Sequence, residues 1–293
     1  MKKLYYIYAN WRKNDVDFIN SLDISKKIDI GPCSFSLKEG GDLDKIVNHY
    51  SKKDGLFSKT KPKDFEIKQA SCLFTKEELN NSKYYAIELL GSETSPNRWP
   101  QPNKKQEYQE QIFIFDKYKN GQIISMANKK QIAPFKIMPP KWKKAEVCFN
   151  LGLEYEYILF KKEFYMEVLA PLGLEAMEVI DYKTNKTLDD SVQLIIPNAK
   201  SKLLLKNSAY DIYPKEQTGG FKQYTMQTLD FFPEFETDFN FHTCYSLEDF
   251  LGGHKKIIIS QEFSKLLINH NIISKNKEGL TPVKTVNINF TSV

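Results

Sequence analysis

The sequence predicts an α+β fold with mixed sheets and short helices, arranged as two lobes that contain a repeated strand-helix-strand unit. The main observation is a pattern that occurs twice, Ile-Leu-Phe-Lys-Lys-Glu-Phe at 158–164 and Ile-Ile-Ile-Ser-Gln-Glu-Phe at 257–263. Each copy has an apolar triplet, two polar residues, Glu-Phe and a stretch with helical spacing, and continues to a second extended segment, at 177–180 and at 283–286. Such a repeat describes a scaffold and leaves the chemistry open.

Length and composition support a folded protein of one large domain or two ordinary ones. The chain has 293 residues, with 41% hydrophobic and 13% aromatic side chains, which is enough to bury a sizeable core. Residues 133–140 include three prolines, and such a segment is typical of a link between lobes. We therefore expect an N-terminal α+β lobe at 1–133 and a C-terminal α+β lobe with the repeated units at 141–293.

The N-terminal lobe shows strand and helix signals in alternation. Thr75 and Glu78 form a capping box, in which two side chains satisfy free amides at a helix start, and this makes 72–79 a third, weaker echo of the repeat. Asn120-Gly121 predicts a hairpin because both residues tolerate positive φ. The expected elements are strands at 4–9, 65–74, 84–90, 112–115 and 122–126, a helix at 15–22, and a helix that buries Leu43, Ile46, Val47 and Tyr50.

The two repeat copies differ at the start of their helices. Ser260 is well placed as the N-cap of the second helix, whereas Lys161 takes that position in the first copy and cannot accept amide hydrogens. The missing cap should cost about 1 kcal/mol and leave the first helix frayed. That helix should bury Phe164, Val168 and Leu172 and should end near Pro171-Gly173.

Aromatic and acidic residues are concentrated between the copies, at 231–241. Phenylalanines at 235, 239 and 241 alternate with polar residues, which predicts a half-buried strand, and a preceding loop carries aromatic side chains. We take this segment, together with the proline-rich loop at 92–103, as the candidate surface for a partner. The alternative is that the phenylalanines are core residues and that the loop aromatic is a packing anchor. The candidate residues are Phe231, Phe232, Glu234, Glu236, Asp238, Arg98 and Trp99.

Motifs that carry chemistry are missing from the sequence. It has no glycine-rich phosphate loop and no Gly-x-Ser-x-Gly, and its four cysteines are far apart, as expected for buried thiols. His242 and Cys244 are the one ligand-like pair, and a metal site needs three or four ligands. We therefore expect no catalytic residue, cofactor or metal. A hydrolase that brings His242 or His254 against carboxylates in a pocket is the alternative.

The charge and hydropathy patterns narrow the classes of partner that we expect. The net charge is +5, but the lysines are scattered and balanced by 37 acidic residues, which favours a solvated face over a nucleic-acid-binding module. Apolar runs are far shorter than the roughly 20 residues that cross a bilayer, so we expect no membrane partner. Residues 1–9 are expected to form a first strand, and we expect a cytoplasmic protein.

The C-terminal stretch carries a family resemblance. Residues 256–267, with the serine-capped helix, and Gly279-Leu280-Thr281-Pro282-Val283 resemble the tail of bacterial immunity proteins that accompany polymorphic and contact-dependent toxins. In that class the chain ends in a strand, a serine-capped helix and a strand that opens near a Pro-Val step. The match covers the last part of the chain, and 158–180 is its divergent copy. The resemblance implies a non-catalytic cytoplasmic protein that binds one cognate toxin domain and blocks it.

Overall fold

The α+β fold is confirmed, with mixed sheets and few, short helices. The computed structural model describes residues 1–24, 27–51, 61–87, 92–93, 105–115, 118–119, 122–123, 129–151, 154, 156–205, 212, 222–224, 230–250, 252–277 and 279–284. The chain divides into two compact units, Met1–Asn81 with Gln227–Asp230, and Ser82–Met226 with Phe231–Val293. The division falls well before the expected boundary at 133–141, and Lys136–Ile137 of that segment is a strand of the second unit.

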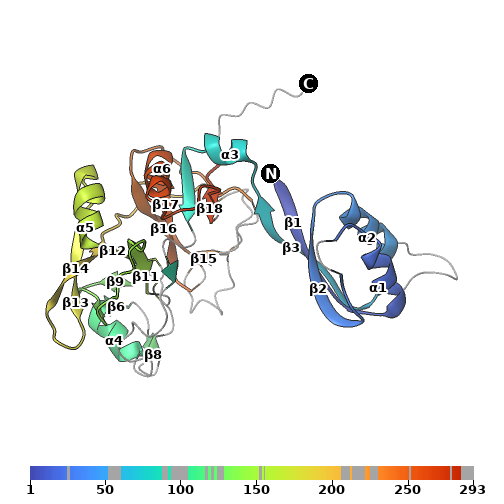
Figure 1. The fold of residues 1–293 in the computed structure, drawn as a ribbon, viewed down its shortest axis with the longest axis horizontal. Helices are drawn as coiled ribbons and strands as arrows, with labels where there is room; N and C mark the ends of the chain where they lie inside the picture. Colours follow the sequence, from blue (N-terminus) through green and yellow to red (C-terminus); the bar gives the residue numbers. More distant parts are fainter. Residues whose placement is uncertain are drawn as a thin grey trace. The chain divides into compact units, whose positions relative to one another are not determined.

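The first unit is an antiparallel sheet, ordered β2-β1-β3, with helices on one side (Figure 1). The odd residues of β1, such as Ile7 and Trp11, are buried against Ile19 and Ile46 of the helices. Val47 is 41% exposed, so the expected stripe of α2 buries three of its four residues. The elements are β1 (Lys2–Trp11), α1 (Lys13–Asn20), β2 (Gly31–Lys38), α2 (Asp42–Ser51), β3 (Lys63–Leu73) and α3 (Lys76–Asn81).

The capping box predicted at the start of α3 is confirmed. The Glu78 amide donates to Thr75 Oγ1 at 3.1 Å, and the Thr75 amide donates to Glu78 Oε2 at 2.7 Å.

The second unit contains a six-stranded sheet, ordered β10-β13-β14-β12-β11-β5, and a five-stranded sheet, ordered β15-β16-β17-β4-β18. Two short antiparallel pairs, β6 with β9 and β7 with β8, accompany them. The second pair joins the two sides of the expected turn at 120–121, which itself lies outside the described residues. The segment expected as the first strand of that hairpin, 112–115, contributes β6, which pairs with β9 instead. The elements are β4 (Tyr84–Ile87), β5 (Ser92–Glu93), α4 (Lys105–Ile112), β6 (Phe113–Ile114), β7 (Tyr118–Lys119), β8 (Gln122–Ile123), β9 (Lys130–Gln131), β10 (Lys136–Ile137), β11 (Cys148–Asn150), β12 (Ile158–Lys161), α5 (Lys162–Phe164), β13 (Ala176–Asp181), β14 (Thr187–Leu194), β15 (Gln223–Tyr224), β16 (Thr243–Phe250), β17 (His254–Ser260), α6 (Gln261–Asn269) and β18 (Leu280–Pro282).

The two large sheets of this unit share one strand arrangement. In the first, the antiparallel pair β11–β12 leads to α5, and β13 then returns two places from β12, with β14 antiparallel between them. In the second, the antiparallel pair β16–β17 leads to α6, and β18 returns two places from β17, with β4 antiparallel between them. Each outer strand, β5 or β15, runs parallel to its neighbour. The duplicated pattern in the sequence is therefore a duplicated sheet.

The register agrees as well as the order. Aligning 158–161 with 257–260 brings all four central strands into correspondence without a shift. One row of cross-strand neighbours is Cys148, Phe160, Val192 and Glu178 in the first sheet and Thr243, Ile259, Tyr85 and Pro282 in the second.

The copies differ in where the middle strand comes from. β14 follows β13 directly, whereas β4 comes from the start of the unit, before every other strand. The second copy is thus completed by a strand from the other end of the unit's sequence, as in a circularly permuted repeat.

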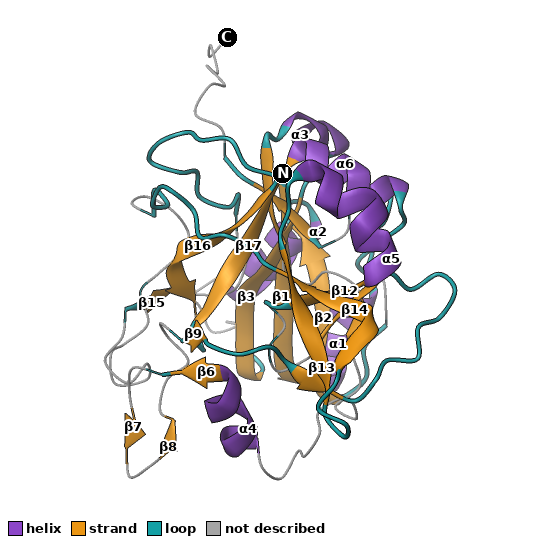
Figure 2. Ribbon diagram, turned by 90° about the vertical axis from the view of Figure 1, so that its left-hand side faces the viewer, coloured by secondary structure: helices purple, strands orange, loops and turns teal. Residues whose placement is uncertain are grey.

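One hydrophobic core joins the helix-covered faces of the two sheets. It contains Phe160 and Phe164 from the first copy and Ile259 and Phe263 from the second. The Phe164 ring also contacts that of His270, the residue after α6, with centroids 5.1 Å apart, and Figure 2 shows α5 and α6 on the same side of the strands. The opposite face of each sheet packs on a separate cluster. The expected second strand at 177–180 is present as β13. In the second copy, β18 ends at Pro282, before the expected segment at 283–286. Of that segment, Val283 makes an isolated bridge with Phe232, and residues 285–286 lie outside the described residues.

The helices of the copies differ as their first residues predict. The Ser260 hydroxyl accepts the Phe263 amide at 3.1 Å, and α6 then runs regularly. Lys161 makes no side-chain cap, and after one α-turn its helix continues as a π-helical segment, Tyr165–Leu169, and a 3₁₀ turn. It ends at Gly173, whose φ of 75° is left-handed.

The strand predicted at 235–241 is not formed. This segment makes isolated bridges only in the part that the structure describes, Phe232 with Val283 and Phe235 with Leu203. Because the segment has no neighbouring strand along its length in the described ranges, its alternating aromatic residues pack into the core but do not form part of a sheet.

None of the helices in the described ranges is long and apolar enough to cross a membrane.

Candidate functional site

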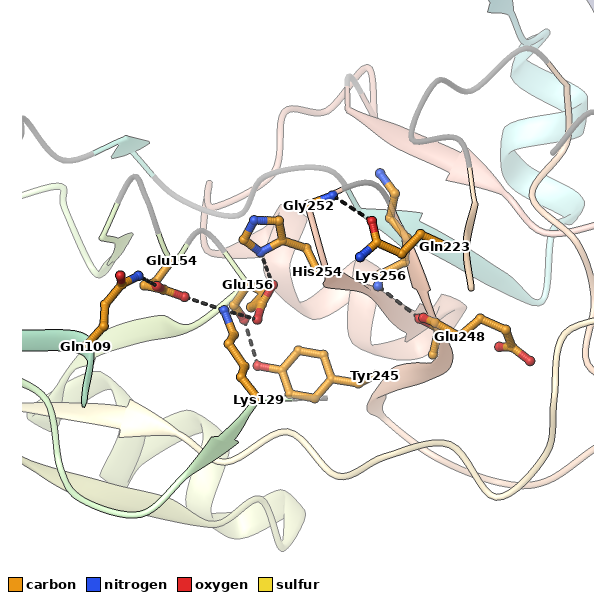
Figure 3. Close-up of polar contacts among 11 residues, drawn as sticks. Gln109, Lys129, Glu154, Glu156, Gln223, Tyr245, Glu248, Gly252, His254 and Lys256 are labelled. Atoms are coloured by element: carbon orange, nitrogen blue, oxygen red, sulfur yellow. Dashed lines mark hydrogen bonds and ion pairs between the residues drawn. The ribbon is translucent and has the colours of Figure 1, made fainter. Parts of the chain in front are cut away.

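A buried cluster of charged side chains lies where the two copies meet in the second unit (Figure 3). Lys129 precedes β9, Glu154 and Glu156 belong to the connection between β11 and β12, and His254 opens β17. The turn of the first copy's hairpin is thereby tied to the first residue of the second copy's central strand. We call these four residues the junction cluster.

The junction cluster is almost dry. The side chains of Lys129, Glu154 and Glu156 are 3%, 0% and 5% exposed. Lys129 Nζ lies 2.7 Å from Glu156 Oε1 and also pairs with Glu154, and His254 Nδ1 lies 2.5 Å from Glu156 Oε2. Gln109 donates to Glu154 Oε1 at 2.6 Å. Each carboxylate therefore has a charged or amide partner inside the protein.

Electrostatic pairing outweighs burial at two members of the junction cluster. Burial favours the neutral form of Glu156, yet Lys129 and His254 hold the pKa of this carboxyl below its usual value. Burial likewise disfavours the ammonium of Lys129, yet Glu156 and Glu154 raise its pKa above the usual value. Both groups are accordingly ionised at neutral pH.

Aromatic rings enclose the ammonium of Lys129. Its Nζ lies 5.2 Å from the ring centroids of both Phe113 and Tyr157, within the range of a cation–π contact. The Tyr245 hydroxyl donates to the Glu156 carbonyl at 2.7 Å. Burial, followed by the charge of Glu156, raises the pKa of Tyr157 and of Tyr245, so both phenols remain protonated.

A cleft of about 510 Å³ opens beside the junction cluster. Glu156 lines this cleft and His254 does not. A Cβ placed on Gly252, whose φ is 87°, would lie 3.0 Å from Cδ2 and 3.3 Å from Nε2 of His254, so this edge of the imidazole faces the Gly252 turn. The cleft is also lined by Lys130, Gln131, Gln193, Asn198, Tyr245, Asp249 and Lys255.

The arrangement of the junction cluster favours a structural role over a catalytic one. A general base must reach a substrate proton, whereas His254 Nδ1 is engaged by Glu156 and the opposite edge of the ring lies against the main chain. Glu156 itself is paired on both sides. The role that best fits the junction cluster is structural: it holds the β11–β12 connection against β17.

The candidate residues from the acidic aromatic segment have different surroundings. Phe232 is fully buried with Phe235 in the core of the five-stranded sheet, so it is a core residue and not a contact for a partner. Phe231 and Glu234 are half-buried, whereas Glu236 and Asp238 are exposed. Arg98 and Trp99 lie outside the described residues.

Asp238 is engaged within the protein. It pairs with Lys83 and accepts the Tyr84 hydroxyl at 2.8 Å, and these hydrogen bonds keep its pKa below the usual value. A second groove, of about 590 Å³, lies beside this pair. It is lined by Lys83, Tyr84, Asn240, Phe241, His242, Ser260, Gln261 and Glu262.

His242 and Cys244 do not form a ligand pair. Cys244 is buried in the core with Ile258, and burial raises the pKa of its thiol, whereas His242 lines the groove. Across the described ranges, no group of three or more His, Cys, Asp or Glu side chains is placed to hold a metal ion.

Among the members of the junction cluster, His254 alone is named by the sequence prediction, which sets it against carboxylates under the hydrolase alternative. For the two acids, a signal is present at one place in the sequence. In Glu154-Tyr155-Glu156-Tyr157, acids alternate with aromatics in a short connection, a pattern that is unusual for a solvated turn.

Comparisons with protein-family models, with curated proteins and with solved structures found no match to this chain.

Proposed function

We propose that this chain is a non-catalytic immunity protein, which binds and neutralises one cognate bacterial toxin domain in the cytoplasm. The observation that supports it is the C-terminal arrangement on which the resemblance rests. β17 leads into α6 through the Ser260 cap, and β18 ends at Pro282, next to Val283. The strand and the serine-capped helix support the resemblance. The last strand departs from it, because β18 ends at the Pro-Val step and does not open there.

The interior of the second unit also suits a protein that acts by docking. Two copies of one sheet share a core, and within the junction cluster the contact between Glu156 and His254 ties the copies together. A scaffold ordered before binding loses less conformational entropy on association, so more of the contact energy becomes affinity. Inhibition by stoichiometric binding needs such a body and no reactive group.

Of the contact residues predicted from sequence, Glu236 and Asp238 are exposed carboxylates, and Asp238 is paired with Lys83. Lys83 and Tyr84, the two partners of Asp238, line the groove together with Phe241, so aromatic area and charge lie together there. Interfaces draw much of their affinity from aromatic anchors, and charge complementarity sets the rate of encounter.

The test is co-expression of the full chain with the toxin domain encoded beside its gene. The proposal predicts that the toxin alone stops growth, that the chain restores it, and that the two proteins co-purify at equal stoichiometry. A toxin that is harmless alone, or one that is neutralised without forming a complex, contradicts the proposal.

One observation favours a second candidate, a hydrolase with a spatially assembled site. The pair of Glu156 and His254 adjoins a cleft, and the pKa of Glu156 is perturbed. Under this alternative, the purified chain hydrolyses ester, phosphodiester or peptide substrates, and His254→Ala abolishes turnover while Glu156→Gln lowers it. If the purified chain hydrolyses a substrate and both variants hydrolyse it at the same rate, the activity comes from a contaminant and the alternative is wrong.

A further inference from the structure

The sheet of the first unit has one face that its own helices leave uncovered. Alternation along β1 sends the odd residues toward α1 and α2 and the even residues to the other side. Tyr6, in the middle of β1, is 39% exposed. Its cross-strand neighbours are Ser36 on β2 and Lys68 on β3. We call this surface the tyrosine face.

Small neighbours keep the rings of the tyrosine face open. Tyr8 stands two residues along β1 and is flanked by Ser34 and Glu66. A serine beside each tyrosine cannot cover the ring, whereas a larger apolar neighbour would. Tyrosine and serine together supply rigid aromatic area and adaptable hydrogen bonds, which is the composition that protein-binding surfaces favour.

The charge of the tyrosine face is positive. Lys2, Lys38 and Lys68 lie on its even rows against one carboxylate, Glu66, which gives +3 − 1 = +2. Lys63 and Asp64, at a bulge on its edge, cancel each other. Glu66 pairs with Lys68 at 2.5 Å, but both side chains are exposed, so this ion pair contributes little to stability. Exchanging this ion pair for a contact with a partner therefore costs little.

The tyrosine face carries both lysines and a carboxylate, and this mixture distinguishes between an acidic protein and a nucleic acid as partner. A single-stranded nucleic acid would stack on the tyrosines and run its phosphates past the lysines, but Glu66 stands opposite Tyr8 and would repel that backbone. A protein surface can place carboxylates on the lysines and a donor on Glu66. The charge pattern therefore fits an acidic protein surface better than a polynucleotide.

We propose that the tyrosine face docks an acidic surface of a protein partner, with Tyr6 as its central anchor and Lys38 and Lys68 as its charged flanks. The partner is the toxin domain of the proposed function, on which this identity rests. This surface belongs to the first unit, whereas the groove beside Asp238 is lined by residues of the second unit.

The experiment measures binding to the full chain of the neighbouring toxin domain, of a fluorescein-labelled oligoglutamate peptide, and of a labelled oligothymidylate of equal charge. The face variants are Tyr6→Ser and the double variant Lys38→Glu with Lys68→Glu. The matched control, Lys183→Glu with Lys186→Glu, makes the same change of net charge on exposed residues of the β13–β14 turn. Thermal unfolding of each variant verifies its fold.

We expect both face variants to weaken toxin binding by at least about tenfold, and the control by less than about twofold. The peptide should lose more affinity in the double face variant than in the control. Equal effects of face and control variants overturn the proposal, and so does oligothymidylate that binds the face more tightly than the peptide does. If the wild-type chain binds no toxin, the proposed function fails, and the peptide comparison alone decides whether the face takes acidic protein.

Discussion

Phe164 and Phe263 occupy the same position in two copies of one strand-helix-strand unit, and both are buried in the same hydrophobic core. Each follows a central strand by one helical turn, and the strands around them agree in order, direction and register. The chain therefore builds one body from two similar halves whose helix-covered faces meet.

Replacing either phenylalanine should destabilise this shared core. Phe164→Ala and Phe263→Ala should each lower the free energy of unfolding by about 3–5 kcal/mol, because each removes a buried ring and leaves a cavity. Urea unfolding measures the loss. Met166→Ala, at a residue that is 58% exposed on the same helix as Phe164, is the control and should cost less than about 0.5 kcal/mol. A cost near the control's for either phenylalanine contradicts a core shared by the two copies.

The caps of the two helices should respond in opposite directions. Ser260→Ala should cost about 1 kcal/mol, since the Phe263 amide loses its acceptor. Lys161→Ser places an acceptor where none acts and should stabilise the chain by up to about 1 kcal/mol. Chemical denaturation of the two variants measures both effects. Lys162→Ser, one residue beyond the cap, should bring no gain, and a gain equal to that of Lys161→Ser would refute the capping explanation.

Breaking the junction cluster should cost more than either cap. Lys129→Met leaves Glu154 and Glu156 buried without their cation and should lower the free energy of unfolding by about 3–5 kcal/mol. The adjacent Lys130→Met, at an exposed side chain, should change it by less than about 0.5 kcal/mol.

Adding Glu154→Gln and Glu156→Gln to Lys129→Met should recover part of the loss, because the buried charges are then removed together. A triple variant that is less stable than Lys129→Met would show that the pairing is not what matters at this place.

The fall in the free energy of unfolding at acidic pH should depend in part on Glu156. Its pKa in the folded chain is lowered, so its stabilising contribution is complete above the pKa of the unfolded chain, about 4.3. That contribution is lost as the pH falls through the lower, folded pKa. The stability difference between the natural chain and Glu156→Gln should be largest near neutrality and should narrow below about pH 4.5. Urea titrations across this range measure it, and a difference that stays constant would mean that the carboxylate is not ionised in the fold.

Much of the scaffold could be predicted from sequence, because its signals are local. The repeat at 158–164 and 257–263, the Ser260 cap and the Thr75 box are all patterns of adjacent residues, and all are present in the structure. The placement of β4 was not predictable in this way. Its partners on β17 and β18 lie near the other end of the sequence, and no local pattern encodes so distant a pairing.

Most of the candidate site was missed for the same reason, although the hydrolase alternative named His254 against carboxylates. Lys129, Glu156 and His254 are spread over the chain and meet only through the tertiary fold. The segment at 231–241 failed differently. Its alternation marked Phe235, Phe239 and Phe241 as packing inward but missed Phe232, which is fully buried. A strand also needs a neighbour along its length, and in the described part this segment has only isolated bridges.

The surface carboxylates offer a test of the predicted partner contact. Glu236→Lys with Asp238→Lys should weaken toxin binding at least about tenfold if this segment touches the toxin. Glu163→Lys, which alters an exposed carboxylate on α5, is the control. Calorimetric titration of the toxin domain with each variant measures the affinity. Unchanged affinity in the double variant removes the segment from the interface.

The central claim is that the chain acts by binding a toxin and not by catalysis, and titrated neutralisation tests it most directly. The activity of a fixed amount of the neighbouring toxin domain is measured while the purified chain is added in steps. The account predicts a linear fall that reaches zero at one chain per toxin, with His254→Ala as effective as the natural chain. Complete inactivation at a small fraction of one equivalent would contradict the account, because it means turnover. Loss of inactivation in a His254→Ala variant whose thermal unfolding matches that of the natural chain would contradict it as well.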